Sequence, residues 1–265
     1  MPSRGSWLAH PLARGLDLDD PRTTERRRRI ILDKPFLRSI YAEWYAQIID
    51  ALPQRPGTVV EIGSGGGFLK SLLPDLVTSE LLAISGVDVV LDARALPFRD
   101  GCLRAIVMTN VLHHIPEPRR FFAEASRCVA EGGRIICVEP WVSLWARFVM
   151  RFHHEPFEPQ AKTWEFDTAG PLSGSNGALP WILFERDRAL FLHEFPHWQL
   201  EIVHAGMPFR YLLSGGVGSW ISAPGWSYAI FLALDRLIAS RTRTLDLFAT
   251  IVLTRTMVRE AAAPT

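Results

Sequence analysis

The chain has 265 residues, of which 48% are hydrophobic and 22% charged, and its formal net charge is +1. A chain of this length can form one large α/β core with a substantial insertion. The near-neutral charge gives no bulk attraction to nucleic acid, and we expect no nucleic-acid partner. Its three cysteines form no CxxC pair, so neither a disulfide framework nor a structural zinc site is expected.

Residues 1–30 are polar and turn-rich, and we expect them to be a mobile segment before a single domain of residues 31–265. They contain no apolar stretch typical of a signal peptide. No run of about 18 uncharged apolar residues occurs, so we expect a cytoplasmic protein without a transmembrane segment. The basic run Arg26 to Arg29 is either a solvated helix face or a contact for phosphate or anionic lipid, which leaves peripheral membrane contact open.

The middle of the chain alternates between helical and strand patterns. Apolar residues spaced by three and four from Leu37 to Leu52 predict a helix that ends at Pro53. Residues 58–62 form a β-branched run that leads into glycines and is typical of a buried parallel strand. Four further strands are predicted over residues 76–80, 87–92, 105–110 and 134–139.

Helices are predicted between these strands, over residues 68–73 and 118–130. Gly132 and Gly133 follow the second helix and are expected to close it as a C-cap. Strands that alternate with helices in this order indicate a parallel sheet with right-handed crossovers.

The C-terminal third is less regular. Helices are predicted over residues 141–152 and 226–238, and two late strands over 198–204 and 247–253. Residues 155–180 are rich in Pro, Gly, Ser and Asn, and such a long loop is uncommon unless it is functional. It either closes over a ligand or is a packed Ω-loop.

The glycine-rich turn after the first strand reads Glu61-x-Gly63-x-Gly65-x-Gly67. Glycines at such a turn let backbone N–H groups and a helix N-terminus approach a ligand closely. The spacing differs from the GxGxxG of a dinucleotide site. Glu61 would repel a pyrophosphate but attract the ammonium of an amino-acid-like ligand. This argument favours S-adenosylmethionine (SAM) over NAD.

The segment Val60-Glu61-Ile62-Gly63-Ser64-Gly65-Gly66-Gly67 resembles motif I of the class I SAM-dependent methyltransferases of the small-molecule type. Further matches follow in the order of that family: Glu80, Asp92-Ala93-x-x-Leu96-Pro97-Phe98, Asn110-Val111-Leu112-His113-His114 and Gly132-Gly133-Arg134. The resemblance covers residues 58–140 and fades afterwards.

The resemblance implies an α/β, Rossmann-like, seven-stranded doubly wound sheet with an antiparallel last strand, helices on both faces and C-terminal insertions. Residues 58–140 would be the cofactor-binding core, and residues 141–240 would supply substrate-side helices and loops, with an insertion at about 205–240. SAM would be the cofactor and S-adenosylhomocysteine its product, in a monomer or homodimer.

The resemblance also assigns roles to single residues. Glu61 would hold the ammonium, Glu80 the ribose hydroxyls, Asp92 the exocyclic amine of adenine, and the Ala93 backbone the ring. Each acid has a plainer alternative: a cap of the turn for Glu61, a solvated strand end for Glu80 and an Asx-turn for Asp92. The expected cofactor site is completed by Gly63, Ser64, Gly65, Gly67, Asn110 and Tyr41.

Methyl transfer from a sulfonium is an in-line displacement, for which the protein supplies alignment. A hydroxyl acceptor also needs a base, and histidine suits that task. His113 and His114, after the fourth strand, are the first candidates, although either could instead cap the turn. His154, in His153-His154-Glu155, is the next. Adjacent histidines point apart on a helix, so we expect no metal site there.

The sequence therefore predicts SAM-dependent methyl transfer to a small-molecule acceptor, a hydroxyl of a secondary metabolite, sugar or lipid-like compound. Two alternatives remain open from the motifs alone. One is an enzyme of the same fold that catalyses a cyclisation or elimination. The other is a non-catalytic SAM-binding partner protein.

Overall fold

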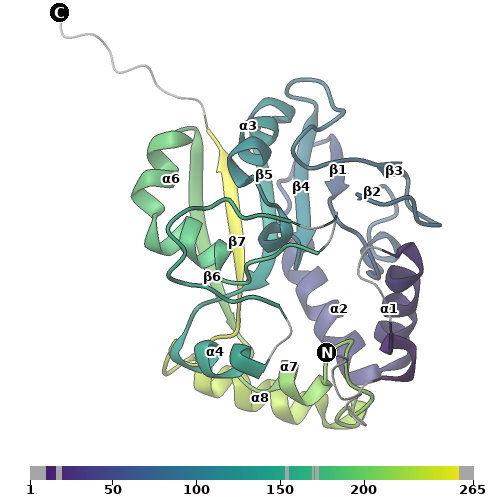
Figure 1. Ribbon diagram of the computed structural model, residues 1–265. Coiled ribbons are helices and arrows are strands. Elements are labelled where there is room, and N and C mark those ends of the chain that lie inside the picture. Colours follow the sequence, from purple (N-terminus) through teal and green to yellow (C-terminus); the bar gives the residue numbers. More distant parts are fainter. Residues whose placement is uncertain (1–9, 16–19, 153–154, 169, 171–172, 257–265) are drawn as a thin grey trace, which may run out of the picture.

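The computed structural model describes residues 10–15, 20–152, 155–168, 170 and 173–256 (Figure 1). Its centre is a seven-stranded sheet in the order β3-β2-β1-β4-β5-β7-β6. The strands are β1 (Thr58–Glu61), β2 (Val77–Glu80), β3 (Val89–Val90), β4 (Leu103–Thr109), β5 (Val129–Pro140), β6 (Trp198–Gly206) and β7 (Phe248–Arg255). β7 is antiparallel to both neighbours, and the other adjacent pairs are parallel. The predicted fold class is confirmed.

Helices cover both faces of the sheet because its buried strands are apolar on both sides. Val59, Val107 and Val138 pack with α2 (Pro35–Asp50) on one face. The residues next to them, such as Val60 and Ile106, pack on the other face against α3 (Pro118–Cys128), the π-helical turn Ile182–Arg186 and α6 (Arg188–Glu194).

The remaining helices lie toward the carboxyl ends of the parallel strands. Figure 1 shows α4, α7 and α8 gathered at this end of the sheet, with α1 beside α2. They are α1 (Pro21–Asp33), α4 (Leu144–Val149), α5 (Leu179–Trp181), α7 (Arg210–Ser214) and α8 (Tyr228–Ala239). Short 3-10 turns occur at η1 (Pro11–Ala13), η2 (Leu69–Ser71), η3 (Leu112–His114), η4 (Met150–Phe152) and η6 (Gly225–Ser227). Among the described residues, no helix is long and apolar enough to cross a membrane.

The late strands agree with the prediction, since β6 and β7 form an antiparallel pair. The connection between them carries α7, η6 and α8, as expected of an insertion. The helix expected over residues 68–73 is only the turn η2. The expectation that Gly132 and Gly133 cap a helix is wrong: α3 ends at Cys128, and both glycines lie inside β5, where the pairing register with β4 shifts.

Within residues 1–30 the sequence pattern did not predict α1, which begins at Pro21. Asp20 caps it, because its Oδ1 accepts a hydrogen bond from the Arg22 backbone N–H at 2.9 Å. Proline at the first helical position is also favourable there. The helix matters for function because it packs onto the glycine-rich turn, as described below.

Candidate cofactor and acceptor site

A cavity of about 520 Å³ opens at the carboxyl ends of β1, β2, β4 and β5. Ligands of open α/β sheets bind at this edge, where the strand order reverses. Most of the predicted site residues line this one cavity: Tyr41, Glu61, Gly63, Ser64, Gly65, Gly67, Glu80, Asn110, His113 and His114. The sequence motifs are therefore brought together in space.

The glycine-rich turn is held on two sides. Gly63 has a φ of +65°, a conformation that favours glycine. The Gly65 N–H donates to Glu80 Oε1 at 2.7 Å, which ties the turn to the end of β2. On the other side, a side chain at Gly66 would collide with the backbone of Arg28 in α1. The turn is thus enclosed between β2 and α1.

The Glu61 carboxylate is buried in the wall of the cavity, with 2% of the residue exposed. Burial, and then the nearby Glu80 charge, raise the pKa of Glu61 to about 8. Within the described part of the chain, no basic side chain forms an ion pair with Glu61. A buried acid without a cationic partner suits a ligand that brings its own positive charge. This geometry fits the ammonium of an amino-acid-like cofactor.

Glu80 is also buried, at 8% exposed, and burial raises its pKa. One carboxylate oxygen accepts the Gly65 N–H, and the other accepts the Leu81 N–H at 3.1 Å. The solvated alternative for this strand end is wrong, because the side chain is enclosed at the cavity wall.

Asp92 and Ala93 are set apart from the other predicted cofactor residues, outside the lining of the cavity. The Asp92 carboxylate accepts hydrogen bonds from the Arg94 side chain at 2.7 and 3.0 Å and from the Arg94 backbone N–H at 2.8 Å. Arg94 also bonds Glu117 at 2.6 Å. Ala93 lies in the hydrophobic core. The role of both residues at adenine stays a prediction.

His113 is oriented by a buried acid that the motif analysis did not single out. Its Nδ1 lies 2.6 Å from Oε2 of Glu139, which has no exposed surface. The other oxygen of Glu139 accepts the backbone N–H groups of Val111 and Leu112 at 2.9 and 2.7 Å. Glu139 therefore fixes both the η3 turn and the His113 ring.

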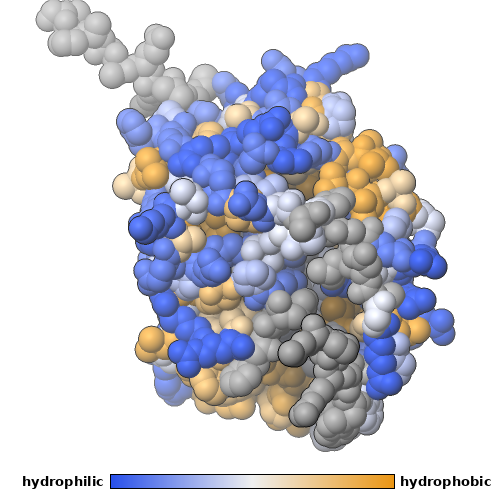
Figure 2. All heavy atoms as spheres, viewed as in Figure 1, coloured by the Kyte–Doolittle hydropathy of each residue, from blue (hydrophilic) through white to orange (hydrophobic). Residues whose placement is uncertain are grey.

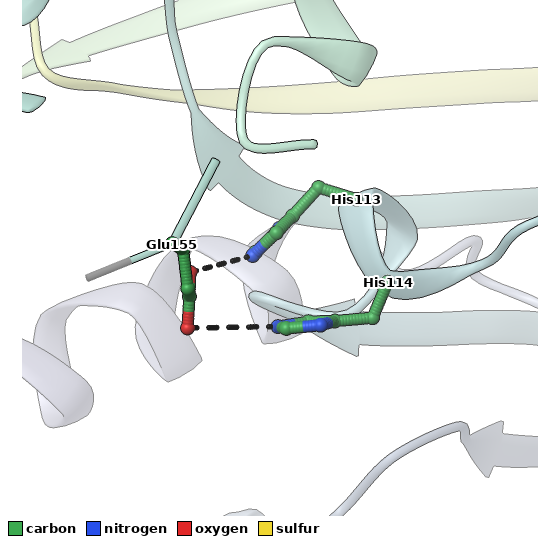
Figure 3. A group of neighbouring side chains, drawn as sticks. All are labelled: His113, His114 and Glu155. Atoms are coloured by element: carbon green, nitrogen blue, oxygen red, sulfur yellow. Dashed lines mark ion pairs between the residues drawn. The ribbon is translucent and has the colours of Figure 1, made fainter. Parts of the chain in front are cut away.

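His114 and Glu155 complete a cluster on the same wall (Figure 3). His114 Nδ1 donates to the Gly174 carbonyl at 3.2 Å. The Glu155 carboxylate lies opposite both rings, 3.5 Å from His113 Nε2 and 3.9 Å from His114 Nε2. The third candidate base, His154, lies outside the described residues.

The two histidines have opposite pKa shifts. Burial lowers the pKa of His113, but Glu139 and Glu155 outweigh burial and raise it to about 9. Burial and then the His113 charge lower the pKa of His114 to about 4. The two rings therefore differ: the surrounding carboxylates favour the charged form of His113, whereas burial favours the neutral form of His114.

The loop of residues 155–180 is packed where it is described, as in the Ω-loop alternative. The Asn176 side chain is buried, and its Oδ1 accepts the backbone N–H groups of Glu158 and Ala178. The Asn176 N–H donates to the His113 carbonyl at 2.9 Å, which joins the loop to η3. Residues 155–157 and Gly177 line the cavity. Closure over a ligand stays a prediction.

Sequence reasoning missed several cavity residues. Arg27 of the basic run is half-buried and lines the cavity, whereas Arg26, Arg28 and Arg29 are exposed. The run is therefore both a solvated face and part of the site. Glu139 could have been found as the acid that directly follows the apolar run Ile135 to Val138. Other missed residues are Thr24, Ile31, Tyr45, Tyr211, Leu212 and Gly215 to Ser219.

Comparison with known proteins finds similarity over part of the chain. A family model described as a methyltransferase domain matches residues 60–137. A demethylmenaquinone methyltransferase of Renibacterium salmoninarum is 25% identical over 139 residues, 41% of this chain and 55% of that protein. An uncharacterized 37.1 kDa protein in transposon Tn4556 of Streptomyces fradiae is 30% identical over 119 residues, 37% of this chain and 34% of that protein. The chain spans about half the length of the first relative and about a third of the second.

Solved structures share the fold along most of the chain. A SAM-dependent methyltransferase of Thermotoga maritima has a TM-score of 0.56 at 18% identity, covering 89% of this chain and 98% of that one. One of Archaeoglobus fulgidus has a TM-score of 0.52 at 12% identity, covering 82% and 94%. The matched methyltransferase model thus covers the part of the chain that carries the glycine-rich turn and the histidine pair, and the solved methyltransferases share its seven-stranded fold.

Proposed function

We propose that the chain transfers a methyl group from SAM to a hydroxyl of a small, lipid-like acceptor. The observation that carries the proposal is one cavity with two chemically different walls. Glu61 and the glycine-rich turn form one wall, and the cluster of His113, His114 and Glu155 lies in the other. When bound, SAM supplies an electrophilic methyl group, and the remaining task of the protein is alignment and proton removal.

At the cofactor wall, Glu61 holds the ammonium of SAM. Burial of Glu61 and the absence of a basic partner among the described residues support this role. The turn from Gly63 to Gly67 lets the backbone approach the cofactor, and Glu80 accepts hydrogen bonds from ribose hydroxyls, a role supported by its burial at the cavity wall. Tyr41 of α2 and Asn110 after β4 also line this cavity.

At the acceptor wall, the cluster receives the acceptor hydroxyl and removes its proton. His114 Nδ1 donates to the Gly174 carbonyl, so the lone pair of this ring is on Nε2, toward Glu155. Nε2 of His114 and the Glu155 oxygens can therefore accept a proton from an acceptor. Glu139 fixes the orientation of the His113 ring beside these two groups.

The nature of the acceptor is suggested by an exposed apolar face at the cavity end of the molecule. We name as the apolar face the exposed residues Leu144, Phe148, Trp220, Ile221, Trp226, Ile230, Leu234 and Leu237. Figure 2 shows apolar side chains gathered along the lower edge of the view, over α4 and α8. Exposed apolar surface of this extent marks an interaction site.

The apolar face adjoins the cavity, because Met150 and residues 215–219, which line the cavity, are neighbours in sequence of Phe148 and Trp220. Exposed arginines accompany it at positions 147, 151, 236, 241 and 243. Tryptophan and aliphatic side chains flanked by arginine fit the surface of an anionic membrane. We therefore propose that the acceptor is amphipathic and enters from a lipid surface.

The first experiment is calorimetric titration of the full chain with SAM. We expect one SAM per chain, and an affinity reduced at least about 100-fold by Gly65→Arg, which is about 2.7 kcal/mol. The large side chain at Gly65 would project beside Glu80. Gly101→Arg is the matched control, because Gly101 also has a positive φ but faces open space. Absence of SAM binding by the wild-type chain would refute the proposal.

The second experiment incubates the chain with labelled SAM and a lipid extract, and analyses the products by mass spectrometry. The expected product is an extract component heavier by one methylene group. Its formation should disappear with Gly65→Arg and persist with Gly101→Arg. Transfer to water-soluble components alone would contradict a lipid-like acceptor while leaving methyl transfer intact.

A further inference from the structure

The cluster beside the cavity brings together three groups that can each donate a lone pair. His113 and His114 come from η3, and Glu155 comes from the segment after η4. The candidate ligand atoms of the three residues all lie within 4.8 Å of one another. Figure 3 shows both rings directed at the same carboxylate.

Hydrogen bonds at the far side of each ring determine where its lone pair lies. Nδ1 of His113 donates to the Glu139 carboxylate, and Nδ1 of His114 donates to the Gly174 carbonyl. Both partners are acceptors, so each ring carries its proton on Nδ1, and the lone pair of the neutral ring is on Nε2. Both Nε2 atoms face Glu155. When the Glu155 carboxylate is ionised, its oxygens can only accept hydrogen bonds, so a lone pair on either Nε2 meets no donor there.

One added proton does not give all three groups of the cluster a favourable partner. Protonation of His113 would turn its Nε2 into a donor toward Glu155, but the lone pair of His114 would still face the same carboxylate. A single cation bound to all three groups would satisfy them together. A carboxylate or carbonyl on the far nitrogen is also the usual support for a metal-binding histidine. Glu139 is itself held by the Val111 and Leu112 N–H groups, so the support is rigid.

We propose that His113, His114 and Glu155 bind a divalent first-row transition-metal ion at the acceptor wall of the cavity. Two imidazole nitrogens and one carboxylate favour Zn²⁺, Fe²⁺, Mn²⁺ or Co²⁺ over Mg²⁺ and Ca²⁺, which prefer oxygen ligands. Ligand distances in such sites are about 2.0–2.2 Å, so Glu155 moves slightly toward the rings on binding. Three protein ligands leave coordination positions open toward the cavity, as in catalytic metal sites.

The role of the ion rests on the proposed function, whereas its binding does not. An acceptor oxygen at an open position would lose its proton more readily, because a bound cation lowers the pKa of a ligated O–H group. The ion would then replace direct proton transfer to a histidine.

The test is titration of the full chain, first freed of metal with a chelator and dialysed, with Co²⁺ alone. Binding is followed by calorimetry and by the visible absorption of Co²⁺. We expect one Co²⁺ per chain, and an affinity reduced at least about 10-fold by Glu155→Gln and by His114→Gln. His193→Ala is the matched control, because His193 is exposed on α6, away from the cavity, and it should bind Co²⁺ as the wild type does.

Two outcomes would overturn the metal site. One is no Co²⁺ binding by the wild-type chain, which would assign the cluster to a proton. The other is binding that survives both substitutions, which would place the ion elsewhere. SAM titration of the same metal-free proteins shows whether each variant keeps its cavity and separates the two proposals. SAM binding without Co²⁺ binding refutes only the metal site, whereas Co²⁺ binding without SAM binding refutes only the proposed function.

Discussion

The sequence and the structure both indicate that Glu61 favours a ligand with a positive charge. A carboxylate before a glycine-rich turn already disfavours a pyrophosphate ligand. The structure adds that this carboxylate is buried beside a second acid, which raises its pKa to about 8. The free protein therefore holds a proton on Glu61 at neutral pH, whereas an ammonium ligand stabilises the ionised form.

SAM binding should consequently release about one proton from Glu61 at pH 6.5. At this pH Glu61 is protonated in the free chain, and the α-amino group of the ligand, with an ordinary pKa of about 7.7–8.0, is charged. The measurement is the binding enthalpy in buffers of different ionisation enthalpy, whose dependence gives the number of protons released. Glu61→Gln should bind SAM about 10–100-fold more weakly and release about one proton fewer. Equal proton release by wild type and variant would show that Glu61 does not contact the ammonium.

Single residues also show where sequence reasoning ends. The glycine-rich turn was recognisable from its own residues, and Glu80, Asn110 and the two histidines were singled out by their resemblance to the motifs of the methyltransferase family. All of them line the one cavity, because strand ends meet at one edge of a sheet. Asp92 matched its motif equally well, but Arg94, only two residues away, engages its carboxylate. Glu139 and Glu155 were not recognised as partners of His113, because those contacts depend on how distant segments pack.

At the scale of elements, α1 shows why a periodic pattern can fail. Its buried residues are Thr23, Thr24, Ile30 and Ile31, so most of its length carries no apolar stripe. The signals that were present are local ones, an aspartate cap followed by proline. The strands were predictable because runs such as 105–110 are apolar on both faces. The predicted ranges for β3 and η2 were longer than the observed elements, because the length of such short elements depends on packing.

The cavity end of the molecule is joined to α2 by a buried ion network. Arg210 of α7 is 1% exposed, and its Nε bonds Asp235 of α8 at 2.7 Å. The same guanidinium bonds Glu43 of α2 and, at 2.7 Å, the Tyr228 hydroxyl. Three helices that are far apart in sequence therefore share one buried charge.

Asp235→Ala should lower the free energy of unfolding by about 3–5 kcal/mol, because it leaves the Arg210 charge buried with fewer partners. The exposed pair Arg29–Asp33, at 3.5 Å, provides the control, and Asp33→Ala should change stability by less than about 1 kcal/mol. Urea denaturation followed by circular dichroism measures both values. Similar effects of the two substitutions would mean that the network does not hold α7 and α8 to α2.

At the scale of the whole molecule, a parallel sheet was predictable because alternating strands and helices have few allowed topologies, and its seven strands with an antiparallel last one were implied by the family resemblance. The cavity wall beyond β5 was not predictable. It is built from a packed loop and from helices of the insertion, and no local sequence pattern determines where these segments lie. The apolar face belongs to this less predictable part. The tryptophans and phenylalanines of residues 141–152 and 220–226 were noticeable in the sequence, but only the structure separates buried Trp141 from exposed Phe148 and Trp226.

The apolar face should bind anionic lipid vesicles. The wild-type chain is expected to co-sediment with phosphatidylglycerol vesicles more than with phosphatidylcholine vesicles, and less at high salt, because its arginines are screened. Trp226→Asp combined with Ile230→Asp should weaken vesicle binding at least about 10-fold, since both side chains lose favourable burial in lipid. Both positions are exposed, so the fold should be retained.

Leu190→Asp, at an exposed position on α6, is the matched control and should bind vesicles as the wild type does. If the double variant binds vesicles normally, or if the wild type is a dimer that the double variant converts to a monomer, the face serves another partner and the acceptor does not enter from lipid.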